Sequence, residues 1–163
     1  MATTARTKIN TFLWYATQAE EAARFYTSIF PDSRVNGVWA LPAESPSGPA
    51  GSVKVVDFTL LGQRFQAITA EPHHDFNDAI SIVVTCEDQA ELDRYWNALL
   101  QGGGKEQACG WLTDKFGLRW QIIPRVLEEL MRTDDTTRGR RVAEAMLQMV
   151  KLDIATLEKA YRS

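Results

Sequence analysis

Apolar and polar residues follow a pattern along the chain that occurs twice. Residues 9–15 and 80–86 are rich in apolar, β-branched and aromatic side chains, which predicts two strands. Each strand is followed by apolar residues at helical spacing, over about residues 18–30 and 88–100. Thr17 and either Glu87 or Asp88 stand where the N-caps belong, and Pro31 and Gly102 follow the two helices.

The second half of each copy shares the motif Gly-x-Arg-aromatic-Gln-x-Ile, at residues 62–68 and 117–123. The glycine of each motif lies between two strand-like runs, which is typical of a tight hairpin turn. The sequence therefore predicts an α+β fold with two β-α-β-β-β modules, at about residues 6–70 and 79–124. We expect the modules to form a curved mixed sheet around a shared cavity, where a ligand could bind. The first module is longer through a Pro- and Gly-rich segment at 42–51, which predicts a loop.

The register changes after Pro124, and the remaining residues predict helices at about 126–131, 134–150 and 154–161. Val142, Ala145, Met146 and Met149 share one face of the second of these helices. This amphipathic tail needs a surface to cover, either on its own domain or on another subunit. We expect one domain at residues 1–125 and a C-terminal helical extension at 126–163.

Composition and charge describe an ordinary globular chain of 163 residues, 45% hydrophobic, 24% charged and with a formal net charge of −3. That charge gives no basic field for nucleic acid or an anionic membrane, so we expect neither as a partner. The two cysteines, Cys86 and Cys109, are predicted to be free thiols among apolar neighbours. Residues 1–8 lack an apolar leader core and no apolar run is long enough to cross a bilayer, so we expect a cytoplasmic protein.

Specific motifs resemble a known family over nearly the whole chain. They lie at residues 11–31, 72–81, 86–91, 109–121 and 145–153. With these motifs the chain resembles the PhnB-like family, which is labelled 3-demethylubiquinone-9 3-methyltransferase and belongs to the vicinal-oxygen-chelate (glyoxalase/bleomycin-resistance) superfamily. The resemblance implies the paired-module fold, in agreement with the internal repeat, and it implies a homodimer.

The methyltransferase label conflicts with the sequence pattern. A methyltransferase usually holds its cofactor at a glycine-rich turn between a strand and a helix of a doubly wound sheet. Here the three glycines at 102–104 follow a predicted helix and precede a predicted strand, which indicates a helix end and a turn. We therefore do not expect ubiquinone methylation.

The resemblance also implies where a metal would bind, because metal-dependent members of the superfamily carry His or Glu on the first and last strand of each module. The matching positions here are Asn10, Gln66, Ser81 and Gln121. Neutral amides and a hydroxyl are poor ligands for divalent transition metals, so we expect no metal and no other cofactor. These four side chains could instead hydrogen-bond a small ligand, and the alternative is that they satisfy backbone groups or bridge the modules.

Three further residues are candidates for the site. Trp14 and Trp111 could form aromatic walls of the cavity, or else belong to the core or a dimer contact. His73 lies in a predicted loop after a strand and is our candidate general base, although a plain surface histidine at a strand end is the alternative.

These observations leave three hypotheses about function. The first is a metal-free protein that binds, and could convert, a small organic molecule in the sheet cavity. The second is a metal-dependent lyase, isomerase or dioxygenase with ligands displaced toward His73, His74 and the nearby acids. The third is a non-catalytic dimeric binding protein. The sequence does not decide whether the protein is an enzyme.

Overall fold

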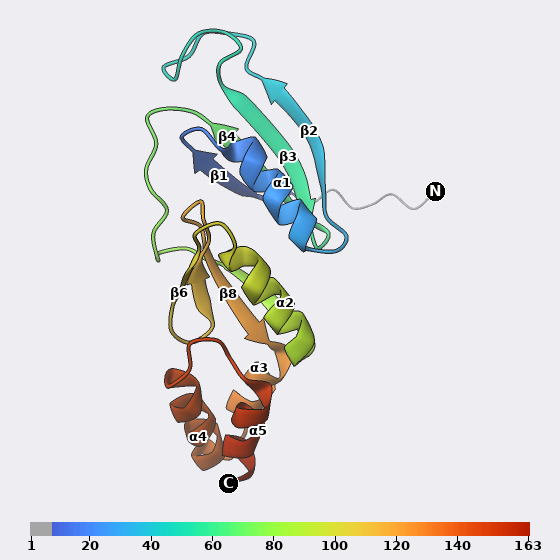
Figure 1. Cartoon of the computed structure of the whole chain (residues 1–163), viewed down its shortest axis with the longest axis vertical. Coiled ribbons are helices and arrows are strands. Elements are labelled where there is room, and N and C mark those ends of the chain that lie inside the picture. The colour runs from blue at the N-terminus through green and yellow to red at the C-terminus, as the bar shows by residue number, and fades with distance from the viewer. Residues whose placement is uncertain (1–7) are drawn as a thin grey trace, which may run out of the picture. The chain divides into compact units, whose positions relative to one another are not determined.

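The computed structural model describes residues 8–163, so the expectation about a leader falls largely on residues outside the described part. The chain divides into two compact units, Met1–Asp75 and Phe76–Ser163, and each contains its own four-stranded sheet and a helix that follows its first strand (Figure 1). Among residues 8–163, no helix has the length and apolar character that a membrane span requires.

The first unit contains one helix and four strands. Its elements are β1 (Thr11–Tyr15), α1 (Ala19–Ile29), β2 (Arg34–Ala40), β3 (Lys54–Leu60) and β4 (Gln63–Thr69). The strands form a mixed sheet in the order β1-β4-β3-β2, in which β1 is parallel to β4 and the other neighbours are antiparallel. This is the predicted β-α-β-β-β module.

The second unit repeats this arrangement and adds three helices. Its elements are β5 (Ile82–Cys86), α2 (Gln89–Leu100), β6 (Lys105–Glu106), β7 (Trp111–Thr113), β8 (Arg119–Pro124), α3 (Arg125–Met131), α4 (Thr136–Leu147) and α5 (Ile154–Arg162). The strand order is β5-β8-β7-β6, again with the first and last strands parallel. The repeat and the helical tail are therefore confirmed, with two four-stranded sheets, while the cavity shared by both modules stays a prediction.

The turns and caps follow the local sequence with one exception. Gly62 and Gly117 adopt positive φ angles of 77° and 87°, which glycine reaches without steric cost. Asp88 caps α2 by accepting a hydrogen bond from the Glu91 N–H. Thr17 does not cap α1, which begins after Gln18 without a side-chain cap. The Ala19 N–H instead donates to Thr69 Oγ1 on β4 at 3.2 Å, so the neighbouring strand supplies the acceptor.

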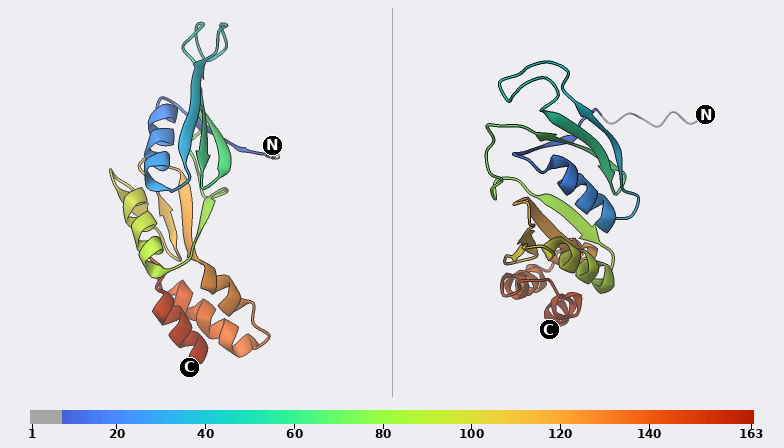
Figure 2. Two further views of the ribbon diagram at one scale, coloured as in Figure 1. Left: turned by 90° about the vertical axis from the view of Figure 1, so that its right-hand side faces the viewer. Right: turned by 45° about the horizontal axis from the view of Figure 1, so that its top comes forward.

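One face of each sheet is covered by the helix of its own module (Figure 2). The second module packs α2 through four buried side chains, Leu92, Tyr95, Trp96 and Leu99, against the sheet. Because side chains along a strand point alternately to opposite faces, each sheet also has an open face away from its helix. Of the candidate site residues, Trp14, Gln66, Trp111 and Gln121 belong to strands and lie on these open faces, whereas His73 lies in the loop after β4.

Candidate ligand-binding site

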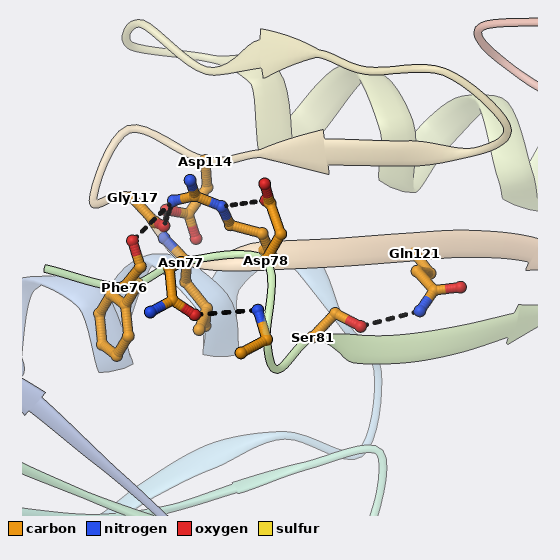
Figure 3. Close-up of polar contacts among 10 residues, drawn as sticks. Phe76, Asn77, Asp78, Ser81, Asp114, Gly117 and Gln121 are labelled. Carbon is orange, nitrogen blue, oxygen red and sulfur yellow. Dashed lines mark hydrogen bonds and ion pairs between the residues drawn. The ribbon is translucent and has the colours of Figure 1, made fainter.

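The four positions that the sequence resemblance aligns with metal ligands form two hydrogen-bonded pairs, one in each unit. Asn10 Nδ2 donates to Gln66 Oε1 at 3.1 Å. Gln121 Nε2 donates to Ser81 Oγ at 2.8 Å, as Figure 3 shows. In each pair, a residue just before the first strand contacts a residue in the last strand of the same module. The repeat thus places the pairs equivalently, but their meeting around one ligand stays a prediction.

A pocket of about 400 Å³ lies in the second unit between the open face of its sheet and the helices that follow. We call it the apolar pocket. The sheet side contributes Val83, Cys109, Trp111, Gln121 and Ile123. The helical side contributes Leu127, Glu128, Met131 and Arg132 from α3 and Met146 from α4.

Cross-strand pairing explains why these sheet residues meet. Gln121 on β8 is paired with Val83 on β5 and with Trp111 on β7, so the three side chains form one row on the open face. The row places an amide between an aliphatic and an aromatic side chain. Ile123 follows two residues further along the same face.

The polar chemistry of the apolar pocket is limited to a few groups. Gln121 uses its Nε2 to bind Ser81, which leaves Oε1 as an acceptor with no partner among the described residues. Glu128 and Arg132 form an ion pair at 2.8 Å, and both side chains are more than half exposed. An amide acceptor surrounded by apolar walls suits an organic molecule that carries at least one hydrogen-bond donor.

The predicted site residues of the first unit do not line this pocket, and Ser81 of the second unit does not line it either but binds Gln121. Trp14 donates its indole N–H to the Ala70 carbonyl at 2.7 Å, while 43% of its surface stays exposed. His73 follows β4, with Nδ1 3.0 Å from Glu71 Oε2 and Nε2 3.7 Å from Asp75 Oδ1. His73 is therefore held between two carboxylates of its own loop, and its catalytic role stays a prediction.

Several residues of the apolar pocket were not among the predicted site residues. Val83 and Ile123 belong to strands whose alternation could have placed them beside Gln121. Met146 belongs to the apolar helix face that needed a surface to cover. No local pattern predicts that this face lines a pocket together with β8, because that placement arises from the tertiary path after Pro124.

The two cysteines are free and lie in different environments. Burial raises the pKa of the Cys86 thiol to about 12, with Glu91 adding to the effect. Cys86 therefore stays protonated at neutral pH. Cys109 is only half-buried and lines the apolar pocket.

The residues at the four positions that the sequence resemblance aligns with metal ligands do not suit a transition-metal ion. Their side chains supply only neutral oxygen and nitrogen atoms, from Asn10, Gln66, Ser81 and Gln121. These side chains also hydrogen-bond one another, Asn10 with Gln66 and Gln121 with Ser81. Between residues 8 and 163, no cluster of three His, Cys, Asp or Glu side chains has the spacing to hold a metal ion.

Comparison with known proteins identifies what the chain is similar to. A family model described as 3-demethylubiquinone-9 3-methyltransferase matches residues 7–123. The PhnB protein of Bacillus cereus, which carries the same family description, is 34% identical in sequence. The alignment covers 72% of this chain and 99% of that protein, with a TM-score of 0.63. No curated protein matches the chain.

Two more distant structures share the fold alone. Protein PA1353 from Pseudomonas aeruginosa is 22% identical, with a TM-score of 0.56, over 71% of this chain and 96% of that one. The fosfomycin resistance protein FosX from Mesorhizobium loti is 16% identical, with a TM-score of 0.54, over 78% of this chain and 98% of that one. The α+β fold expected from the sequence is thus confirmed by several structures.

The fold does not fit the usual S-adenosylmethionine site that a methyltransferase requires. Each sheet has a single parallel strand pair, β1–β4 or β5–β8, and antiparallel neighbours elsewhere. A doubly wound sheet would place several parallel strands side by side, with a glycine-rich turn leading into a helix. Gly102 and Gly103 follow α2 with positive φ angles, as the sequence predicted for a helix end.

Proposed function

The chain belongs to the family described as 3-demethylubiquinone-9 3-methyltransferase, and from that premise we propose that it binds a small organic molecule in the apolar pocket without a metal. Gln121 is the polar group that orients the ligand, and Trp111 is the aromatic wall. We do not assign methylation, because neither sheet offers the usual cofactor site.

The observation that carries this proposal is the apolar pocket itself. Its volume of about 400 Å³ is within the range of small-molecule sites, and an amide with an unused acceptor lies in its wall. All of its lining residues belong to one compact unit, so its existence does not depend on how the units are arranged.

The proposal is one of binding, and conversion of the ligand is left open. The titratable side chains of the lining are Cys109, Glu128 and Arg132, and the last two neutralise each other. His73, the candidate base from the sequence, lies in the other unit. Sequestration or transport of an organic ligand therefore needs fewer assumptions than catalysis.

The test uses the fluorescent probe 1-anilinonaphthalene-8-sulfonate and the variant Val83→Trp. Val83 is 54% exposed, so a larger side chain can extend into the pocket without disturbing the core. We expect the wild-type protein to bind the probe saturably and Val83→Trp to weaken binding by about tenfold or more, because the pocket is filled.

The matched control is Phe12→Trp, at the equivalent position of the first unit. Phe12 pairs with Gln66 as Val83 pairs with Gln121, and it is 51% exposed. Equal weakening by both variants, or no saturable binding to the wild-type protein, would contradict a ligand site in the apolar pocket.

The family resemblance also supports two broader proposals. We propose that the protein acts in the cytoplasm and forms a homodimer, as expected from the sequence. The first unit exposes Phe12, Trp14 and Trp39 at 51%, 43% and 45% of their surfaces, and self-association could cover such side chains.

A further inference from the structure

A second pocket, of about 660 Å³, lies in the second unit around β6, β7 and the turn between β7 and β8. We call it the turn pocket. It shares no lining residue with the apolar pocket, and most of its lining is polar. Three cationic side chains line it, Lys105, Lys115 and Arg119.

The carboxylates that line the turn pocket already have other partners. Asp114 is buried and accepts hydrogen bonds from two backbone N–H groups of its own turn and from the indole of Trp120. Glu106 accepts a hydrogen bond from Trp96 Nε1 at 3.0 Å. Among residues 8–163, Lys105 forms no ion pair, so its charge is available to a bound anion.

Arg119 is held by three hydrogen bonds and keeps one nitrogen, Nη2, unused. Its Nε donates to Asp78 Oδ1 at 2.8 Å, and its Nη1 donates to the carbonyls of Phe76 at 3.1 Å and Gly117 at 2.6 Å (Figure 3). Its Nη2 has no hydrogen-bond partner in the described part of the chain, although only 20% of the side chain is exposed. A guanidinium fixed in this way can bind a ligand without losing further side-chain freedom.

In the first unit, the residues equivalent to those of the turn pocket form hydrogen bonds with neighbouring side chains of the same sheet. Arg34, Thr59 and Arg64 form a cross-strand row there, as Lys105, Thr113 and Arg119 do in the second unit. In the first unit, Arg64 binds Asp57 through both Nε and Nη2, and Thr59 receives a hydrogen bond from Asn36.

The different hydrogen bonding of Arg64 and Arg119 comes from a single position on the neighbouring strand. Asp57 pairs with Gln66 on the first sheet, and Trp111 pairs with Gln121 at the equivalent place on the second. Because Trp111 has no carboxylate, Arg119 turns to Asp78 and binds it through Nε alone. The hydroxyl of Thr113 likewise has no partner among the described residues.

Gln107 adds an unused acceptor to this set of donors. Its side chain donates to Asp78, which, after the hydrogen bond from Arg119, helps to lower the pKa of that carboxyl. Only the amide nitrogen can donate, so this contact fixes the orientation of the amide. Gln107 Oε1 is then buried with no hydrogen-bond partner in the described structure, which is costly unless an occupant supplies a donor.

We propose that the turn pocket binds a small oxyanion that also carries a hydroxyl group. Arg119 Nη2, Lys105 Nζ and the Thr113 hydroxyl would contact the anionic oxygens, and Gln107 Oε1 would accept from the hydroxyl. Hydrogen phosphate and α-hydroxy acids share this chemistry. The site goes beyond the proposed function, because it is separate from the apolar pocket and does not depend on that pocket being occupied.

The experiment titrates the full-length protein with inorganic phosphate, glycolate and acetate at constant ionic strength. The readout is the NMR signal of Arg119 Nε and of the backbone amides of Thr113 and Gly117. We expect saturable shifts with phosphate or glycolate, and at least about tenfold weaker binding of acetate, which lacks the hydroxyl. Phosphate alone or glycolate alone would identify which of the two sources the site accepts.

The variant is Lys105→Gln and its matched control is Arg34→Gln. Both side chains are exposed and occupy equivalent edge positions, so both variants remove one charge without disturbing a core. We expect Lys105→Gln to weaken binding about tenfold and Arg34→Gln to leave it unchanged. The proposal is overturned by the absence of saturable shifts with both phosphate and glycolate, by equal weakening in both variants, or by acetate binding as tightly as whichever of the two hydroxyl-bearing anions binds.

Discussion

Gln121 has a local environment that determines what it can do. Its Nε2 is held by Ser81 at 2.8 Å, and its side chain lies between Val83 and Trp111 on the open face. An amide cannot lose a proton at physiological pH and brings no negative charge to a cation. The same holds for Asn10 and Gln66, which bind each other at the equivalent place. These groups are suited to recognising a neutral ligand and poorly suited to binding a transition metal.

This chemistry predicts the metal content of the protein. We expect elemental analysis of the purified protein to find no stoichiometric transition metal, and we expect Zn²⁺, Ni²⁺ and Mn²⁺ to leave the melting temperature unchanged. A metal near one per chain, or a saturable rise in melting temperature, would favour a metal-dependent enzyme. The variant His73→Ala would then show whether the ion lies near the loop after β4.

The two thiols are predicted to react at very different rates. Burial raises the pKa of Cys86 to about 12, so its reactive thiolate is almost absent at pH 7 to 8. Cys109 is half-buried and lines the apolar pocket. We expect iodoacetamide to modify Cys109 well before Cys86 in the native protein, as followed by peptide mass spectrometry, with Cys109→Ser as the control. Faster modification of Cys86 would contradict the burial that we assign to it.

At the scale of elements, the turn between β7 and β8 depends on a buried carboxylate. Asp114 is 3% exposed and accepts from the N–H groups of Phe116 and Leu118 and from Trp120 Nε1, at 2.8, 3.1 and 2.8 Å. The indole of Trp120 belongs to the core that packs against α2. A single side chain therefore ties the turn to the core of the second unit.

Removal of this carboxylate should destabilise the protein more than loss of a helix cap. We expect Asp114→Ala to lower the free energy of unfolding by about 3 kcal/mol, because three donors lose a buried acceptor. Asp88→Ala, which removes the cap of α2, should cost about 1 kcal/mol. Urea unfolding measures both, and an Asp114→Ala loss no larger than that of Asp88→Ala would contradict the structural role of the turn.

Local sequence predicted the elements well because their signals are local. Each signal determines the structure of residues only a few positions away. Examples are the turn glycines 62 and 117, the Asp88 cap and the apolar stripe of α2. The missing cap of α1 could not be foreseen, because its acceptor is Thr69 on a distant strand. The hydrogen-bonded pairs Asn10–Gln66 and Ser81–Gln121 follow from the aligned repeats, but α3 and α4 as walls of a pocket do not.

At the scale of the whole molecule, the duplicated module has diverged in what covers its open face. In the second unit, α3 and α4 form one side of a pocket against that face. In the first unit, Phe12, Trp14 and Trp39 remain 51%, 43% and 45% exposed. Three large aromatic side chains exposed in one compact unit are unusual for a surface that contacts only water. The divergence favours ligand binding in the second unit and self-association through the first.

The proposed self-association through the first unit predicts the mass of the protein in solution. We expect sedimentation equilibrium to give twice the mass of one chain, and we expect Trp39→Glu to weaken the dimer because a charge would be buried without a partner. Leu147→Glu is the matched control, since Leu147 is 61% exposed but lies at the end of α4 in the other unit. Two results would contradict this role of the exposed aromatic side chains of the first unit. One is a monomeric wild-type protein, and the other is a dimer that Leu147→Glu weakens and Trp39→Glu does not. In either case the apolar pocket can be tested separately, because its lining residues all belong to the second unit.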